Sequence, residues 1–171
     1  TLAEALRLGA YRAIHRASAA QRHVRAQLAV RDALIRTRTR YVNVVRALTR
    51  REGLRVATGG PEHLERKLAA LPLAPELVAE LAPLRVVLEP VNGQIALADA
   101  QLAATAGADP LFARLRTAPA IGPVTAVAFV ATLDDVCRFR TAHQVAGYLG
   151  LTPREYSSGE RQQRGRISKT G

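Results

Sequence analysis

The sequence predicts a mainly α-helical chain: a long antiparallel helical hairpin or coiled coil, then a small helical domain with a helix-hairpin-helix. Three observations support this fold class. Alanine and leucine dominate and aromatic residues are only 4% of the 171 residues, which favours helices over a β-sandwich. No glycine or proline interrupts residues 19–51. An Ala-Gly-Ala-Asp-Pro stretch at 106–110 marks a boundary, so we expect domains at 1–106 and 111–171.

The first long helix is expected from about Ala19 to Arg51. Its apolar residues recur mostly at three-, four- and seven-residue intervals, which predicts one apolar seam. A helix this long with a narrow seam needs a partner helix, from the same chain or another. The other faces carry nine arginines, among them Arg36, Arg38 and Arg40 as candidate nucleic-acid contacts. The seam residues are Val24, Leu28, Leu34, Ile35, Val42, Val45 and Leu48.

The return of the chain is expected over residues 75–106. Glycines at 53, 59 and 60 end the first helix, and Pro61 is well placed in the first turn of a short helix that ends near Leu71. The returning helix contains Pro83 and Pro90, which must bend or interrupt it because each removes a backbone donor. An antiparallel hairpin or an intermolecular coiled coil follows. Its apolar side comprises Leu84, Val87, Leu88, Val91, Ile95, Ala98 and Leu102.

The last sixty residues predict shorter elements. We expect helices over 111–117, 124–133 and 141–149, with a tight turn over 118–122. Pro123 begins the second of these helices, while Thr141 caps the third and Gly150 closes it. From Thr152 onward the sequence is polar, and we expect irregular structure there. Cys137 lies among apolar neighbours in the sequence and is expected to be a buried, inert thiol.

The net charge of +11 is unevenly distributed. Residues 1–56 carry 13 Lys and Arg against 3 Asp and Glu, residues 57–109 carry 3 against 7, and residues 110–171 carry 9 against 4. A basic start, an acidic middle and a basic end indicate two nucleic-acid-facing surfaces with a spacer between them. The alternative is an arginine-rich surface that contacts only solvent.

Several function classes are disfavoured. A single cysteine excludes an internal disulfide and a Cys-rich zinc site, and the four histidines lack a paired metal-ligand spacing. No apolar run reaches membrane-spanning length, and the first residues do not form a signal peptide. We therefore expect a soluble cytoplasmic protein with no membrane partner and no metal site in this chain.

Two motifs could contact phosphate. The turn over 119–126 fits a helix-hairpin-helix, in which Gly122 lets the backbone approach a phosphate and the helix start, with Thr125, presents N–H groups and a positive dipole end. Ala120 stands where such a hairpin usually has glycine. A purely structural turn is the alternative.

The second motif is the basic loop that contains Ser157 and Ser158. A serine nucleophile that attacks a phosphodiester needs an accessible hydroxyl, cations and a way to lose its proton. Gly159 leaves room beside Ser158, but no general base is evident. The alternative is a flexible basic loop that touches phosphates. The candidate cations are Arg154, Arg161, Arg164, Arg166 and Lys169.

The end of the chain resembles a known family. Residues 140–154, Arg-Thr-Ala-His-Gln-Val-Ala-Gly-Tyr-Leu-Gly-Leu-Thr-Pro-Arg, are followed by Tyr-Ser-Ser-Gly and Gly-Arg-Ile-Ser-Lys-Thr-Gly. This pattern closely resembles the C-terminal domain of the IS110-type (DEDD) insertion-sequence transposases, which are relatives of the Piv DNA invertases. Leu-Ala-Glu-Ala-Leu-Arg-Leu-Gly at 2–9 and Arg-Thr-Arg-Thr-Arg at 36–40 resemble the middle region of that family.

The resemblance implies a site-specific DNA recombinase. It implies that Ser158, rather than its neighbour Ser157, becomes covalently joined to DNA. The implied partners are DNA, a structured bridge RNA and further copies of the chain. These copies would form a dimer or tetramer through the coiled coil. The implied location is the nucleoid of a bacterial cytoplasm.

The resemblance also implies what this stretch lacks. The family's magnesium ions bind four acidic residues of an RuvC-like N-terminal domain, and the fourth precedes the point at which this chain begins. We therefore expect no cofactor here, an incomplete C-terminal domain, and binding without recombination by this stretch alone. Glu160 replaces a frequent glycine of the family. The rival reading is a non-catalytic nucleic-acid-binding and oligomerisation module; a third is a structural coiled-coil protein without nucleic-acid affinity.

Overall fold

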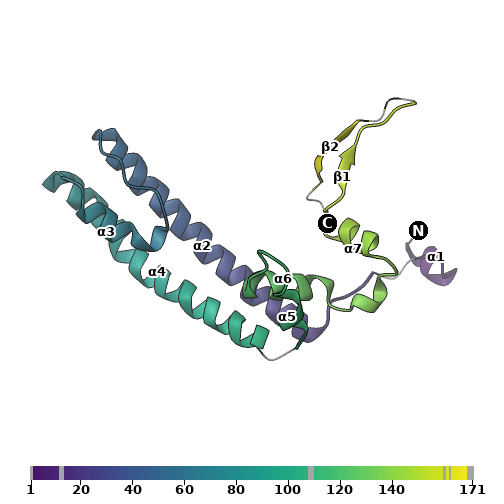
Figure 1. Cartoon of the computed structure of the whole chain (residues 1–171). Coiled ribbons are helices and arrows are strands. Elements are labelled where there is room, and N and C mark those ends of the chain that lie inside the picture. The colour runs from purple at the N-terminus through teal and green to yellow at the C-terminus, as the bar shows by residue number, and fades with distance from the viewer. Residues whose placement is uncertain (1, 12–13, 108–109, 160, 162, 169–171) are drawn as a thin grey trace. The chain divides into compact units, whose positions relative to one another are not determined.

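The computed structural model describes residues 2–11, 14–107, 110–159, 161 and 163–168, and these are mainly helical, as predicted (Figure 1). The chain divides into two compact units, residues 1–131 and 132–171, which are described separately. The first unit begins with a short helix, α1 (Leu2–Arg7). The predicted division into 1–106 and 111–171 stays a prediction.

The first unit is built on an antiparallel helical hairpin. Helix α2 (Ala19–Arg51) lies beside α4 (Pro75–Gly107) along much of its length (Figure 1). The Oγ of Ser18 accepts a hydrogen bond from the Gln21 N–H (3.2 Å) and caps α2. In the predicted seam of α2, Val42 and Val45 are buried and the other members are half-buried. The hairpin is therefore confirmed, while its coiled-coil geometry stays a prediction.

The two ends of the hairpin hold separate apolar clusters. One includes Val42, Val45 and Leu88, and the other includes Leu102 with Leu28 packed against it. Between them the contact turns polar: Arg31 Nε donates to Asp99 Oδ1, and Arg38 Nη1 donates to Asn92 Oδ1 at 3.4 Å. The two pairs are seven residues apart on each helix, which is about two turns, so both lie on the faces of α2 and α4 that meet. They fix which turns of α2 and α4 oppose each other.

The connection between the helices begins at a tight helix end. The N–H of Gly53 donates to the Arg50 carbonyl and that of Leu54 to the Thr49 carbonyl, each at 3.0 Å. This double closure requires a left-handed residue, and Gly53 has φ +74°. A 3₁₀ turn, η1 (Pro61–His63), and helix α3 (Leu64–Ala69) follow. The predicted short helix with Pro61 in its first turn is confirmed.

Helix α4 runs through both of its prolines. Pro83 and Pro90 lie inside the helix, and the interruption allowed by the sequence is not observed. Both prolines are exposed, as are Ala79 and Val86, whose carbonyls lose the N–H donor that each proline lacks. These carbonyls can therefore bond to water. Of the residues predicted on the apolar side of α4, Leu88, Ile95 and Leu102 are buried, whereas Val87 is 42% exposed.

Two further helices close the open end of the hairpin. Helix α5 (Pro110–Leu115) and the start of α6 (Pro123–Leu133) agree with the predicted helices. Phe112 of α5 and Val127 of α6 join Leu102 of α4 in one buried cluster. The Nε of Arg25 on α2 also donates to the Ala131 carbonyl (2.8 Å). Residues beyond the predicted boundary thus share the core of the hairpin.

The second unit is small and contains both helical elements and strands. Its 3₁₀ turn η2 (Val136–Arg138) precedes α7 (Ala142–Tyr148), which Thr141 caps and Gly150 (φ +67°) closes, as predicted. The Arg138 guanidinium lies 4.5 Å from the Phe139 ring centroid and 4.2 Å from that of Tyr148, a cation–π arrangement.

Two predictions for this unit are wrong. The segment after Thr152 is not irregular, because strands β1 (Pro153–Glu155) and β2 (Arg164–Ile167) pair antiparallel. Cys137 is exposed, since it lies in the 3₁₀ turn, where its N–H bonds to the Asp135 carboxylate at 2.8 Å. In the described part of the chain, no helix is long and apolar enough to cross a membrane.

Candidate nucleic-acid interface

The two serines lie at the end of the β1–β2 hairpin. The backbones of Ser158 and Arg161 exchange hydrogen bonds, at 3.1 and 3.2 Å, around a two-residue turn. Gly159 takes the left-handed conformation, φ +58°, that such a turn requires. The Tyr156 N–H donates to the Gln163 carbonyl (2.9 Å) and continues the ladder. The sequence therefore places Ser158 at a defined position rather than in an unstructured loop.

The alternation of a β-strand separates the serine side chains. Ser158 shares a face with Tyr156 and with its cross-strand neighbour Arg161, whereas Ser157 shares the other face with Glu155. Both serines are exposed. In the described residues, the Ser158 hydroxyl makes no side-chain hydrogen bond, which leaves it accessible with an arginine opposite.

Ser157 has a partner that sequence reasoning missed. Its Oγ donates a hydrogen bond to Oε1 of Glu155 at 2.7 Å. A carboxylate in this position can accept a proton from a hydroxyl. The signal in the sequence was the two-residue spacing of Glu155 and Ser157. This spacing places both side chains on one face only if the segment is a strand. The irregular structure predicted for this segment would give the two side chains no fixed relation.

The predicted cations of the hairpin are exposed. Arg154, Arg161, Arg164 and Arg166 all lie on the surface, and Lys169 lies outside the described residues. The Arg154 Nη2 donates to the Ser168 carbonyl (3.4 Å) at the base of the hairpin. Gly165 faces Arg154 and Tyr156: a Cβ at this position would lie 3.6 Å from the Arg154 Cβ and 3.7 Å from the Tyr156 ring.

The base of the hairpin is joined to α7. Ser168 donates from its backbone N–H to the Thr152 carbonyl (2.9 Å) and from its Oγ to the Gly150 carbonyl (3.1 Å). The Leu151 N–H reaches back to the Ala146 carbonyl of α7 at 2.8 Å. These bonds connect the serine-bearing strand to a capped helix, so the second unit forms a support for the serines.

The other predicted phosphate contact is the turn before α6. Ala120 has φ +67°, the conformation that a glycine would adopt freely. Gly122 and Thr125 are both exposed, and the Gly122 carbonyl accepts the first helical bond, from the Ala126 N–H (3.0 Å). The turn is thus open to a ligand. Whether it acts as a helix-hairpin-helix stays a prediction.

The three arginines predicted on α2 have different surroundings. Arg40 is exposed, and Arg36 is exposed but pairs with Asp32 (2.7 Å) one turn earlier. Arg38 is half-buried and points toward Asn92 of α4, so part of its side chain stabilises the hairpin. Only two of the three therefore face outward.

Metal chemistry finds no ligand set in the described part of the chain. There, no three His, Cys, Asp or Glu side chains gather closely enough to hold a metal ion. These described residues thus do not fit a magnesium site.

Comparisons with known proteins point in one direction. Residues 112–171 match the model of the transposase IS116/IS110/IS902 family. The chain is 35% identical over 160 residues to the Pseudomonas aeruginosa protein named "Probable family 20 transposase", covering 90% of this chain and 47% of that protein.

Two more relatives are named after insertion sequences. The transposase for IS1111A of Coxiella burnetii is 32% identical over 177 residues, with 99% of this chain and 48% of that protein covered. The transposase for IS1328 of Yersinia enterocolitica is 31% identical over 146 residues, with 83% and 43% covered. The chain spans about half the length of these curated relatives.

Proposed function

The chain belongs to the IS116/IS110/IS902 transposase family, and from that membership we propose that it is the nucleic-acid-binding, nucleophile-bearing part of an insertion-sequence transposase. Its role is to hold DNA and to offer the Ser158 hydroxyl to a phosphodiester. The observation that carries this proposal is the exposed serine at the turn of a basic hairpin, inside the segment that matches the family.

The proposed reaction is a transesterification. The Ser158 Oγ attacks phosphorus and forms a new P–O bond, while the bond from phosphorus to one deoxyribose oxygen breaks. The serine loses its proton, and the leaving deoxyribose oxygen gains one. Because negative charge develops on the phosphoryl oxygens, exposed guanidinium groups on the hairpin stabilise the transition state. Arg161 lies opposite Ser158 and is the first candidate for this role.

The proposed partners follow from charge and family. The basic hairpin and the basic outer side of α2 suit a polyanion, DNA in the reaction and a structured RNA as a guide. For the magnesium ions that the resemblance implies in strand cleavage, the described residues offer no group of three His, Cys, Asp or Glu side chains. A dimer or tetramer assembled through the helical hairpin completes the proposal.

A second function competes with catalysis. In a non-catalytic nucleic-acid-binding and oligomerisation module, the Ser158 hydroxyl would donate to a phosphate without attacking it. This alternative is favoured by one observation: within the described residues no carboxylate or imidazole bonds to the Ser158 hydroxyl, whereas Glu155 bonds to Ser157. The two functions differ in whether a covalent protein–DNA species forms.

Substitution of each serine in an intact family transposase that contains this sequence separates these possibilities. We expect Ser158→Ala to abolish the covalent protein–DNA species on a denaturing gel, and Ser157→Ala, the matched control, to retain it. Loss with Ser157→Ala and with Glu155→Gln, but not with Ser158→Ala, would move the nucleophile to Ser157. Strand exchange without any covalent species would favour the non-catalytic module.

A further inference from the structure

A basic cleft lies at the end of the hairpin where α2 stops. It has a volume of about 270 Å³, is partly open to solvent, and is lined by the last turns of α2 and the loop over 54–59. Three arginines, Arg46, Arg50 and Arg55, line it together with Thr58 and Gly59, and no acidic residue does. None of the sequence motifs pointed to this place.

The cleft is held in shape by the fold. Val56 is buried in the apolar cluster, which anchors the middle of the loop. The Lys67 Nζ of α3 donates to the Gly60 carbonyl (2.8 Å) and fixes the end of the loop. Gly59 has φ +116°, which disfavours any other residue there. A ligand would therefore meet a formed site rather than having to order a loop.

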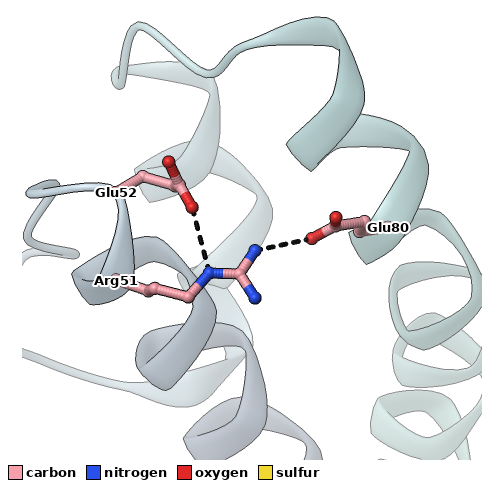
Figure 2. Close-up of polar contacts among 3 residues, drawn as sticks. All are labelled: Arg51, Glu52 and Glu80. Carbon is pink, nitrogen blue, oxygen red and sulfur yellow. Dashed lines mark hydrogen bonds and ion pairs between the residues drawn. The ribbon is translucent and has the colours of Figure 1, made fainter.

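The arginines at this end of α2 differ in whether an acidic side chain neutralises their charge. Arg51, next to Arg50 in sequence, pairs with Glu52 (3.0 Å) and with Glu80 of α4 (3.1 Å), as Figure 2 shows. The hydrogen bond to Glu52 and the charge of Glu80 raise the pKa of the Arg51 guanidinium. In contrast, among the described residues neither Arg50 nor Arg55 forms an ion pair.

One donor at the cleft is buried without a partner. The Nε of Arg46 is inaccessible to solvent and makes no hydrogen bond to any described group. A buried N–H without an acceptor costs about 1–3 kcal/mol, so such groups usually have a structural or ligand-binding explanation. The Arg46 side chain as a whole is half-buried and lines this cleft.

Three positive charges favour an anion strongly enough to outweigh the local helix dipole. The C-terminus of α2 carries roughly half a negative charge, which alone would repel an anion. The three guanidinium groups carry a full positive charge each, and they offer planar, forked donors that match a phosphate group. A hydroxyl from Thr58 adds a neutral donor. The cleft thus suits a phosphate better than a cation or an apolar group.

We propose that this cleft, lined by Arg46, Arg50 and Arg55, binds a backbone phosphate of the nucleic acid that the protein holds. The inference rests on the proposed nucleic-acid binding and adds a second contact point, on the first unit and away from the serine hairpin in the sequence. DNA and RNA present the same phosphodiester chemistry, so either can be the source.

The test compares the removal of two cleft arginines with the removal of one neighbouring, ion-paired arginine in the full chain. We expect Arg50→Gln combined with Arg55→Gln to weaken binding about five- to tenfold at moderate salt and to reduce the log–log salt slope by about one, because one phosphate contact is lost. Arg51→Gln, an adjacent and ion-paired arginine, should leave the slope unchanged. Separate titrations with duplex DNA and with hairpin RNA identify the source as the probe whose slope changes.

Each result has one meaning. An unchanged slope in the double variant, with normal binding by the wild type, overturns the cleft proposal alone. An equal loss in Arg51→Gln also overturns it, because the effect would then be general charge. A wild-type protein that binds neither probe overturns the proposed function as well. Circular dichroism checks that each variant is folded, and the spectra are expected to match the wild type. As a second readout, the bound probe should protect Arg50 and Arg55 from modification by phenylglyoxal.

Discussion

At the scale of single residues, adjacent side chains of one type have different chemistry because the backbone separates them. Ser157 bonds to a carboxylate, while Ser158 faces Arg161 across the turn. Likewise Arg51 is neutralised by two glutamates, and Arg50 is not. Residue identity alone predicted serines and cations in a basic loop, but the assignment of partners required the strand alternation and the helix face.

The turn before α6 gives a stability prediction at this scale. Ala120 has φ +67°, a conformation that costs a non-glycine residue about 1–2 kcal/mol. Ala120→Gly relieves this strain but loosens the unfolded chain, so we expect net stabilisation of about 0.5–1 kcal/mol. Urea denaturation measures it.

The same replacement elsewhere serves as the control. Ala104 is exposed inside α4, and Ala104→Gly should destabilise by about 1 kcal/mol. If both substitutions change the free energy of unfolding in the same direction, the left-handed turn at Ala120 is wrong.

At the scale of elements, the polar middle of the hairpin predicts an asymmetry between ion pairs. Arg31 is 23% exposed and bonds to Asp99, whereas the Arg36–Asp32 pair is exposed on both sides. Asp99→Ala leaves a half-buried guanidinium without its acceptor, so we expect a loss of about 1–3 kcal/mol in unfolding free energy. Asp32→Ala should cost less than about 0.5 kcal/mol. Equal losses in urea denaturation would contradict the packing of α2 against α4.

Much of the helical layout could be predicted from the sequence. The bounds of α2, the cap at Thr141 and the closing Gly150 follow from local signals, which act through nearby backbone hydrogen bonds. The β1–β2 hairpin was missed because its strands are short, polar and exposed, without the apolar alternation that marks a half-buried strand. The continuity of α4 through Pro83 and Pro90 depends on solvent exposure, which the sequence does not state.

The candidate site was predictable only in part. The serines and arginines of the hairpin could be named from the sequence, because their chemistry is explicit in their types. The Glu155–Ser157 bond could not, since it depends on strand alternation. The cleft of Arg46, Arg50 and Arg55 could not either, since it requires the loop after α2 to fold back beside the helix.

At the scale of the whole molecule, the basic charge of residues 1–56 serves two purposes. Some arginines hold the fold, such as Arg25 on the Ala131 carbonyl and Arg31 on Asp99. Others, such as Arg40 and Arg50, face outward. Net charge predicts the attraction to a polyanion but not this division. Deleting the segment would therefore remove half of the hairpin as well as its charge, and single substitutions are the sharper experiment.

The proposed assembly through the hairpin also belongs to this scale. Val86 and Leu97 lie eleven residues apart on α4, hence on one side of it, and are 73% and 57% exposed. If this side meets a second copy, Val86→Glu with Leu97→Glu should shift the protein to monomer in sedimentation velocity. Ala96→Glu with Ala103→Glu adds the same charge to exposed positions on another side of the same helix and should not. A wild-type monomer, or an unaffected oligomer, would contradict assembly through this surface.

The most direct measurement of the proposed role is the identity of the residue that becomes linked to DNA. An intact transposase that contains this sequence would be stopped during reaction with its DNA, digested with protease and nuclease, and examined by tandem mass spectrometry. We predict a nucleotide adduct on Ser158, next to the left-handed Gly159 of the turn. An adduct on Ser157 or on any residue outside the hairpin, from a protein active in strand exchange, would contradict the assignment.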